Sequence, residues 1–452
     1  MRRLLAALLI VLAGCTSSTV DLDVSTSVLD LPTTTTTSVV AATTTTEPPA
    51  TTTTEQGLEP IVPDVASVIP LRPVLLSNDG GGDRARLDPE QMLAWVNEAN
   101  RVFAPSRIGF SYDPNEAPDE VSSTLVNEMS GPGSAGWTDR VVRANEIAAA
   151  FPGELVVFVS GAGSDDEVGS LHLDFVMIRE GATDLCGESD TGLLAHRIGL
   201  YLGLPHTYSA VNDSTAEAAD ALSDALQDVA VFDGDGFGDT LPDPGIHPEH
   251  ACSGEETVRV GGIEFELPRT NIMSHYPERS QLTLEQADRA RWALELRRAR
   301  QMASPSNIVG ADVHEAQDAL SGTSGPCGLA SVERIDRSIG FHWIGGDHLD
   351  VPSEEGCVLE FEIPVPEPGT YDVVALATRA PDHGAVEFMV DGERFALEDL
   401  YAPVLVTTGA TVVGQTTLDA GSVVIGVDVV GTNARSLGSS AGIDGFALVP
   451  VG

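Results

Sequence analysis

The chain has 452 residues, of which 24 are basic and 68 acidic, and its formal net charge is −44. All of the basic residues are arginine. Phosphate contacts depend on clusters of Lys and Arg, so this composition excludes nucleic acids and anionic lipid surfaces as ordinary partners. The length predicts two or three domains, and a hydrophobic content of 42% is enough for their cores.

Residues 1–15 predict export. Two arginines are followed by an apolar stretch that is too short to span a bilayer as a stable helix. The sequence LAGC that ends at Cys15 resembles the bacterial lipobox. This resemblance implies that Cys15 is lipidated and anchors the mature protein to the outer face of the cytoplasmic membrane, and a plain secretory signal is the alternative. Partial release also fits, because one lipid anchor holds a protein only moderately.

The next segment and the remaining cysteines also indicate an exported protein. Residues 16–60 are rich in threonine runs and predict a disordered stalk, because such a segment cannot bury enough apolar surface to fold. Four cysteines follow, and an even number in an exported chain predicts two disulfides. The pairing that keeps each bridge inside one domain joins Cys186 to Cys252 and Cys327 to Cys357.

Residues 61–302 have the pattern of an α/β domain. A helix is predicted from Pro89 through Ala99, with Asp88 as its N-cap and proline in its first turn. Further helices are predicted from 193 and from 282 to 302. Apolar runs predict strands at 68–76, 108–112, 154–159 and 175–178.

The last third of the chain has a different pattern. Residues 303–330 are interpreted as a linker with one short helix near 313–320. Residues 331–452 predict an all-β sandwich, because short β segments alternate with turn signals. Its strands are predicted at 358–365, 369–378, 385–390, 421–430 and 442–449.

Residues 193–208 read LLAHRIGLYLGLPHTY and contain two histidines, His196 and His206. A zinc-protease helix presents two histidines four residues apart, with a glutamate beside the first that deprotonates the metal-bound water. In metzincins the helix stops at a glycine before a third histidine, in the pattern H-E-x-x-H-x-x-G-x-x-H. This chain has the first histidine, the glycine (Gly203) and the last histidine. Arg197 replaces the glutamate, and Leu200 replaces the middle histidine.

Three other stretches strengthen this resemblance. The sequence NIMSHY at 271–276 resembles the metzincin Met-turn, with Met273 as its methionine. The sequence DTLP at 239–242 resembles a stretch of the pappalysin-type metzincins, and LTLEQ at 282–286 resembles the start of the last helix of that family. The resemblance covers about residues 61–302. It implies an α+β or α/β fold with a mixed twisted sheet and an active-site helix.

The two replaced positions argue against catalysis. Arginine stays protonated and cannot act as a general base, and Leu200 cannot ligate a metal. A catalytic zinc normally has three protein ligands plus water, so His196 and His206 are one too few. The prediction is a catalytically inactive metzincin-like domain. The alternative is a divergent zinc metallopeptidase in which His275 is the third ligand of an altered site.

Residues 233–239 read DGDGFGD and place three carboxylates, those of Asp233, Asp235 and Asp239, in a glycine-rich loop. Oxygen ligands on a flexible loop suit calcium. The pappalysin resemblance also implies structural calcium in this region. Phe237 stands where a calcium loop usually offers an oxygen, so a solvated acidic turn is the alternative.

Several stretches of the predicted sandwich resemble the galactose-binding-like jelly-roll modules of bacterial carbohydrate-active enzymes. They are GFHWIGG at 340–346, GTYDV at 369–373, VDGE at 390–393 and GIDGF at 442–446. Such modules bind sugars through exposed aromatic rings and a few polar side chains. The candidate glycan-binding residues are His342, Trp343, His383 and Tyr401, with core packing as the alternative for Trp343 and Tyr401. The sequence therefore predicts a surface lipoprotein that binds a protein, peptide or polysaccharide, rather than an enzyme.

Overall fold

The computed structural model describes residues 66–132, 134–163, 168–184, 186–208, 235–245, 252–260, 263–302, 308, 311–335 and 343–451. The predicted lipidation site Cys15, the stalk at 16–60, Asp233 and His342 lie outside the described residues. Gln56–Gly452 belong to one compact unit. Among the helices that the structure describes, none is long and apolar enough to cross a membrane.

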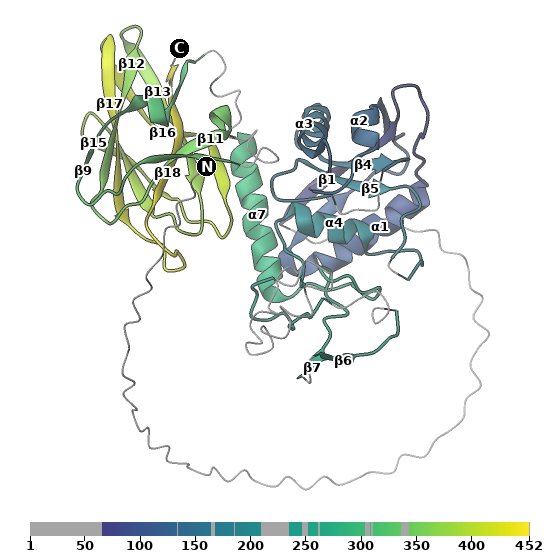
Figure 1. Ribbon diagram of the computed structural model, residues 1–452. Helices are drawn as coiled ribbons and strands as arrows, with labels where there is room; N and C mark the ends of the chain where they lie inside the picture. Colours follow the sequence, from purple (N-terminus) through teal and green to yellow (C-terminus); the bar gives the residue numbers. More distant parts are fainter. Residues whose placement is uncertain are drawn as a thin grey trace, which may run out of the picture. The chain divides into compact units, whose positions relative to one another are not determined.

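The N-terminal domain is built on a parallel sheet with the strand order β2-β1-β4-β5 (Figure 1). The first half of β1 pairs with β2, and its last four residues pair with β3. The resemblance implied a mixed sheet, but these strands pair in parallel, and antiparallel pairing at the β5 edge is an isolated bridge between Val168 and Met177. The strands are β1 (Ser67–Ser77), β2 (Ile108–Ser111), β3 (Asp119–Ser122), β4 (Leu155–Ser160) and β5 (Phe175–Arg179).

Helices cover both faces of this sheet. The carboxylate of Asp88 accepts the N–H of Glu90 at 3.0 Å and caps the first helix, which confirms the predicted N-cap. Two helices between β3 and β4 were not predicted. The helices are α1 (Pro89–Val102), α2 (Thr124–Asn127), α3 (Trp137–Ala148), α4 (Leu193–Tyr201) and α7 (Leu284–Met302), with a 3-10 turn η1 at Ala104–Ser106.

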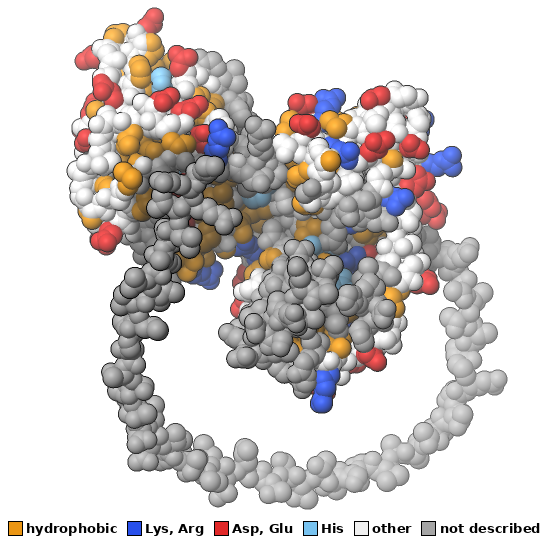
Figure 2. All heavy atoms as spheres, viewed as in Figure 1, with side chains coloured by type: hydrophobic (Ala, Val, Ile, Leu, Met, Phe, Trp, Pro, Cys, Tyr) orange, Lys and Arg blue, Asp and Glu red, His pale blue; other side chains and the backbone are white. Residues whose placement is uncertain are grey.

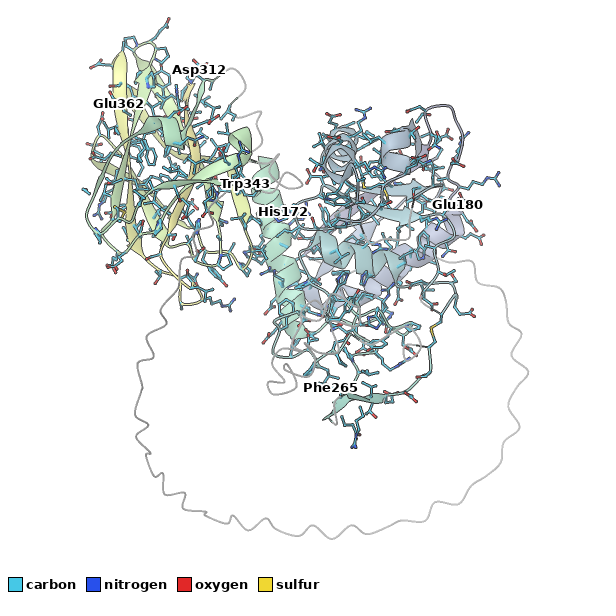
Figure 3. The ribbon with its side chains drawn as sticks, viewed as in Figure 1. His172, Glu180, Phe265, Asp312, Trp343 and Glu362 are labelled. Atoms are coloured by element: carbon cyan, nitrogen blue, oxygen red, sulfur yellow. A yellow bond between two sulfur atoms is a disulfide. The ribbon has the colours of Figure 1, made fainter. Side chains whose placement is uncertain are left out.

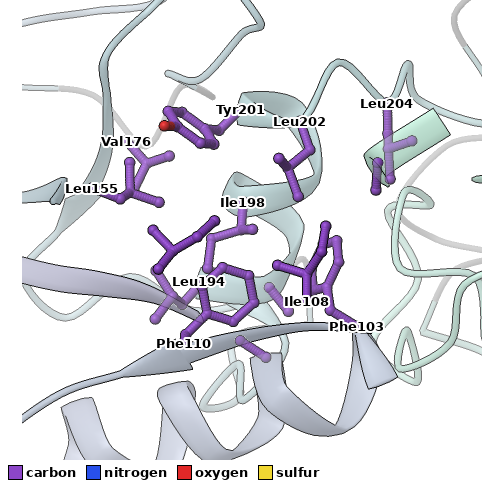
Figure 4. Packing of buried hydrophobic residues seen from close by; sticks show 14 of the residues in the cluster. Phe103, Ile108, Phe110, Leu155, Val176, Leu194, Ile198, Tyr201, Leu202 and Leu204 are labelled. Carbon is purple, nitrogen blue, oxygen red and sulfur yellow. The ribbon is translucent and has the colours of Figure 1, made fainter. Parts of the chain in front are cut away.

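Strand β4 shows how the sheet separates two cores. Successive side chains of a strand point to opposite faces. Leu155 and Val157 therefore pack with α1 and α4, whereas Val156 and Phe158 pack with α3. Figure 4 shows the first of these cores, in which Ile198 of α4 is fully buried.

A β-hairpin follows α4 in the chain, and two disulfides link segments of the protein. Strands β6 (Thr257–Val260) and β7 (Ile263–Glu266) pair antiparallel, and Figure 3 labels Phe265 in this hairpin. Cys186 is bonded to Cys252 and Cys327 to Cys357, so both predicted disulfides are confirmed. Such bridges form and persist in oxidising compartments, which fits an exported protein.

The C-terminal domain is a β-sandwich, as predicted, with two antiparallel sheets. One sheet has the order β10-β11-β18-β13-β16, with β8 beside β18, and the other has the order β15-β14-β17-β12-β9. The rings of Phe361, Phe388 and Phe446 meet in the core. The strands are β8 (Val313–Glu315), β9 (Leu320–Ser324), β10 (Ser331–Arg334), β11 (Asp347–Val351), β12 (Val358–Val365), β13 (Gly369–Arg379), β14 (Ala385–Val390), β15 (Glu393–Asp399), β16 (Val406–Leu418), β17 (Gly421–Gly431) and β18 (Ala441–Pro450).

The sandwich begins earlier than predicted. Residues 303–330 were expected to be a linker, but β8 pairs with β18 and β9 pairs with β12. Between them, the short helix α8 (Ala316–Ala319) buries its two alanines in the sandwich core. The short helix was predicted near 313–320, but the two strands beside it are too short and polar for their apolar pattern to predict their pairing.

Candidate functional site

Helix α4 holds His196 in the interior of the N-terminal domain. The ring is fully buried, and its Nδ1 lies 2.7 Å from the carbonyl oxygen of Ile272. Because a carbonyl only accepts hydrogen bonds, Nδ1 carries a proton and donates it to this oxygen. The helix ends before Gly203, whose φ of 69° lies in the left-handed region that favours glycine. The predicted stop at this glycine is confirmed, and it turns the chain toward His206.

Met273 packs directly against the same helix. Its side chain is fully buried, and its N–H donates to Oδ1 of Asn271 at 2.9 Å. The residue that faces it on α4 is Gly199, where any Cβ would overlap the sulfur of Met273. The turn at 271–276 thus places its methionine against the helix that carries His196.

A row of aromatic rings extends from His196. Its ring centroid lies 5.2 Å from that of His206, with 15° between the planes, and Tyr208 lies 4.8 Å from both His206 and His275. Two imidazoles on one tetrahedral zinc, with Zn–N bonds of about 2.0–2.1 Å, place their centroids about 5 Å apart. The separation of His196 and His206 matches that distance, but the two rings are stacked, and among the described residues no group of three or more His, Cys, Asp or Glu side chains is placed to hold a metal ion. His275 makes its ring contacts with Tyr208 and Tyr276.

The two replaced positions carry side chains of the wrong chemistry for hydrolysis. Arg197 is 6% exposed, so a buried cation follows His196 where the metzincin pattern would have a glutamate. Leu200 packs over Gly169, where a Cβ would lie 3.2 Å from the Cβ of Leu200. Neither side chain can accept a proton from water or ligate a metal.

The acidic loop at 235–239 docks on the start of α7. Gln286 donates to Oδ2 of Asp235 at 3.0 Å, and the N–H of Glu285 donates to Oδ2 of Asp239 at 3.0 Å. The carboxylate of Glu285 in turn accepts the N–H of Gly238 at 2.9 Å. Carboxylates at a helix N-terminus satisfy its open N–H groups and its dipole. Asp239 thus caps the helix and Asp235 binds a side chain of its first turn, and calcium binding by this loop stays a prediction.

A cavity of about 940 Å³ lies where loops of the sandwich face α7. Tyr401 lines it from the loop after β15, half-buried, and its N–H donates to Oδ1 of Asp399 at 3.0 Å. Asn433 donates to the other oxygen of Asp399 at 2.6 Å. Arg379 pairs with Glu398 at 3.2 Å on the same wall. An aromatic ring with amide, guanidinium and carboxylate groups around it suits a polar ligand with flat faces.

Helix α7 forms the opposite wall of this cavity. It contributes Glu285, Asp288, Arg289 and Trp292, which follow the i, i+3, i+4, i+7 spacing of one helix face. The guanidinium of Arg289 lies 4.5 Å from the centroid of the Trp292 ring. Burial lowers the pKa of Arg289 to about 10, so the group stays charged at neutral pH.

The structure buries two of the predicted glycan-binding side chains. Trp343, labelled in Figure 3, is 5% exposed and donates its Nε1–H to the hydroxyl of Thr378 at 2.9 Å. The same hydroxyl lies 2.8 Å from Nδ1 of His348. His383 is 3% exposed, and burial lowers its pKa and lowers that of His348 to about 4. This burial favours the packing alternative for Trp343, and of the three described candidates Tyr401 is the one that lines the cavity.

Asp444 is a buried carboxyl group that sequence reasoning missed. It is 1% exposed within β18, and its oxygens accept the N–H of Ile344 at 3.1 and 3.2 Å. Burial is the main reason that its pKa is raised to about 7, and the nearby carboxylates of Asp347 and Glu315 contribute to this shift. An aspartate among the apolar residues of a strand was the available sequence signal.

Asp444→Asn is expected to stabilise the sandwich at alkaline pH. A folded-state pKa raised above 3.8 means that the contribution of Asp444 is full below about pH 4 and is lost as pH rises through about 7. Asparagine has no such proton to lose, so its advantage in unfolding free energy should grow by about 2 kcal/mol between pH 5 and pH 8. Urea unfolding of both proteins in EDTA measures this difference, and an equal difference at the two pH values would contradict it.

Comparisons with known proteins give partial likenesses. No protein-family model matches the chain, and no curated protein matches it. Similar solved structures include a Paenibacillus xanthan lyase (20% identity, TM-score 0.27, 31% of this chain and 13% of the lyase). Another is a GH26-CBM35 mannanase of Podospora anserina (18% identity, TM-score 0.23, 32% of this chain and 28% of the mannanase). A third is a family 35 carbohydrate-binding module of Clostridium thermocellum (14% identity, TM-score 0.22, 31% of this chain and 99% of the module). The chain spans less than a third of the lyase and of the mannanase, and scores of this size establish no ligand.

Proposed function

We propose that the protein is an exported glycan-binding protein and that its sandwich binds saccharide in the cavity beside Tyr401. The observation that carries this proposal is the half-exposed ring of Tyr401 among Arg379, Asn433 and their acidic partners. A sugar ring offers an apolar face for stacking and hydroxyl groups at its edge. Aromatic and polar side chains in one cavity complement both features.

Tyr401→Ala is expected to weaken saccharide binding about tenfold, because an aromatic contact contributes about 1.5 kcal/mol beyond its buried area. Affinity electrophoresis against a panel of plant and microbial polysaccharides identifies a ligand, and titration calorimetry then compares the variants. Leu397→Ala is the matched control, since it removes an apolar side chain that is 66% exposed on β15 and does not line the cavity. Equal losses for both variants, or retention of a polysaccharide by neither wild type nor variants, would reject the assignment.

For the N-terminal domain, we propose a metzincin-like fold that has lost peptidase activity. The packing of Met273 on α4 and the glycine stop at Gly203 support the fold. The replacement of the general base by Arg197 and of a ligand by Leu200 supports the loss. The domain then serves to bind a protein or peptide, or to carry the sandwich.

A second candidate function, an altered zinc site, is favoured by the 5.2 Å separation of the His196 and His206 rings. With His275 as a third ligand, such a site would polarise a bound water. Metal content of the purified protein tests it, with His196→Ala as the variant and His172→Ala as the control histidine. Near-stoichiometric zinc that is lost only in His196→Ala would support this function, and absence of zinc from the wild type would reject it.

We also propose that Cys15 is lipidated and that the acidic loop containing Asp233, Asp235 and Asp239 binds calcium. Labelling of cells with a radioactive fatty acid, with Cys15→Ser as the control, tests the anchor. Calcium-dependent thermal stabilisation that is weakened by Asp239→Asn tests the loop. A wild-type protein that takes up no label, or whose melting temperature does not respond to calcium, would refute the respective proposal.

A further inference from the structure

We propose that helix α7 of the N-terminal domain completes the saccharide site of the sandwich and selects an anionic saccharide, whose carboxylate pairs with Arg289. This inference rests on the proposed glycan binding and deepens it. It adds two residues of another domain, Arg289 and Trp292, to the site beside Tyr401.

The first step is geometric. Arg289 and Trp292 are three residues apart on α7, so they share one helix face, and both line the cavity that Tyr401 lines from the opposite wall. The guanidinium stacks on the Trp292 ring at 4.5 Å, which holds it in one orientation. The cavity thus has an aromatic ring on each wall and a guanidinium that is stacked on one of them.

The second step concerns the acidic residues that line the cavity, each of which already has a donor. Glu398 pairs with Arg379, and Asp399 accepts from Asn433 and from the N–H of Tyr401. From α7, the carboxylate of Glu285 accepts the N–H of Gly238, and Asp288 pairs with Arg291.

Two of the three arginines that line the cavity are in the opposite situation. Among the described residues, no carboxylate pairs with the side chain of Arg289 or Arg435, and Nε of Arg289 is buried without a hydrogen-bond partner. This is unusual for a chain with 68 acidic and 24 basic residues, whose acidic side chains are spread over the face shown in Figure 2. A half-buried guanidinium that no carboxylate of its own chain neutralises is a site for the carboxylate of a ligand.

The third step identifies the ligand class. Arginine matches a carboxylate with two parallel N–H groups, and the flanking rings offer flat apolar faces. A uronic acid combines both features in one residue, since it has a pyranose ring and a carboxylate. A neutral sugar would stack on the rings but would leave the guanidinium of Arg289 desolvated and unpaired, which costs binding free energy.

The test uses the full chain and two forms of one probe, an α-1,4-linked galacturonate tetramer and its methyl ester, which differ in charge and by one methyl group on each carboxyl. Titration calorimetry should show that the acidic form binds at least tenfold more tightly. Arg289→Gln should weaken binding of the acidic form about tenfold and should not weaken binding of the ester. Arg298→Gln removes the same charge from an exposed position of α7 outside the cavity and should change neither affinity.

The outcomes separate this inference from the function on which it rests. Equal binding of both probe forms, or equal effects of Arg289→Gln and Arg298→Gln, would overturn the role of Arg289 while glycan binding stands. If a neutral polysaccharide binds in a manner that depends on Tyr401 and the acidic probe does not, the inference also fails alone. If neither probe form nor any polysaccharide binds, both proposals fail. Unchanged melting temperatures of the two glutamine variants show that they are folded.

Discussion

Arg297→Met is expected to lower the free energy of unfolding by about 4 kcal/mol, because it leaves several buried carbonyl groups without a donor. Arg297 is 3% exposed. Its Nε donates to the carbonyl oxygen of Tyr201 at 3.1 Å, and its Nη2 donates to those of Ser170 at 3.0 Å and Leu173 at 2.9 Å. The guanidinium centre also lies 3.4 Å from the centroid of the Tyr201 ring.

The loss of the Arg297 hydrogen bonds should affect both the histidine cluster and the cavity beside Tyr401, because Arg297 joins the helices that carry them. Tyr201 is the last residue of α4, so the guanidinium lies at the negative end of the dipole of the helix that carries His196. Arg297 itself belongs to α7, the helix that carries Arg289 and Trp292. The side chain of Arg297 therefore links α4, which carries His196, to α7, which forms one wall of the cavity.

Equilibrium urea unfolding of wild type, Arg297→Met and Arg297→Lys measures the effect. Methionine keeps most of the apolar stem and none of the donors, whereas lysine keeps the charge and fewer directed donors. The lysine variant should lose about half as much as the methionine variant. A loss below about 1 kcal/mol for Arg297→Met would show that water satisfies the freed carbonyl groups.

The strands of the sandwich could be predicted where the apolar pattern is regular. β12 and β14 match their predicted bounds because buried and exposed residues alternate along them. β16 was missed because its run of threonine and glycine has no such alternation. At Gly414 in this strand, the ring of Phe395 occupies the place of a side chain, so the contact depends on a residue of another strand.

In the candidate sites, too, some contacts could be predicted from the sequence and others could not. The proximity of His196 and His206 was predictable, because a helix followed by a glycine turn brings the two positions together. The contact of Tyr208 with His275 joins segments more than sixty residues apart and has no local signal. The wall formed by Arg289 and Trp292 likewise results from tertiary packing. From the sequence alone, Arg289 looks like an ordinary residue of the polar face of a helix, and Trp292 looks like an ordinary core residue.

Gly199→Val is expected to destabilise the N-terminal domain by about 3 kcal/mol or more, through overpacking against Met273. In an ordinary helix position, replacing glycine would be favourable, since glycine costs about 1 kcal/mol relative to alanine. Here any Cβ would overlap the sulfur of Met273, which is fully buried, and would also lie 3.6 Å from Leu204. The steric cost of the valine therefore exceeds the gain in helix propensity. A net loss of stability would show that this position requires glycine, whereas a net gain would show that glycine is only tolerated there.

A double-mutant cycle with Met273→Ala isolates that contact. Met273→Ala alone opens a cavity and should cost about 3 kcal/mol, but the valine at position 199 can fill part of it. The double variant should then be about 2 kcal/mol more stable than the sum of the single losses predicts. Additive losses would mean that the valine is accommodated by movement of α4 rather than resisted by Met273. In that case the turn at 271–276 would not hold the histidine helix in place, and the 5.2 Å separation of the His196 and His206 rings would lose its structural support.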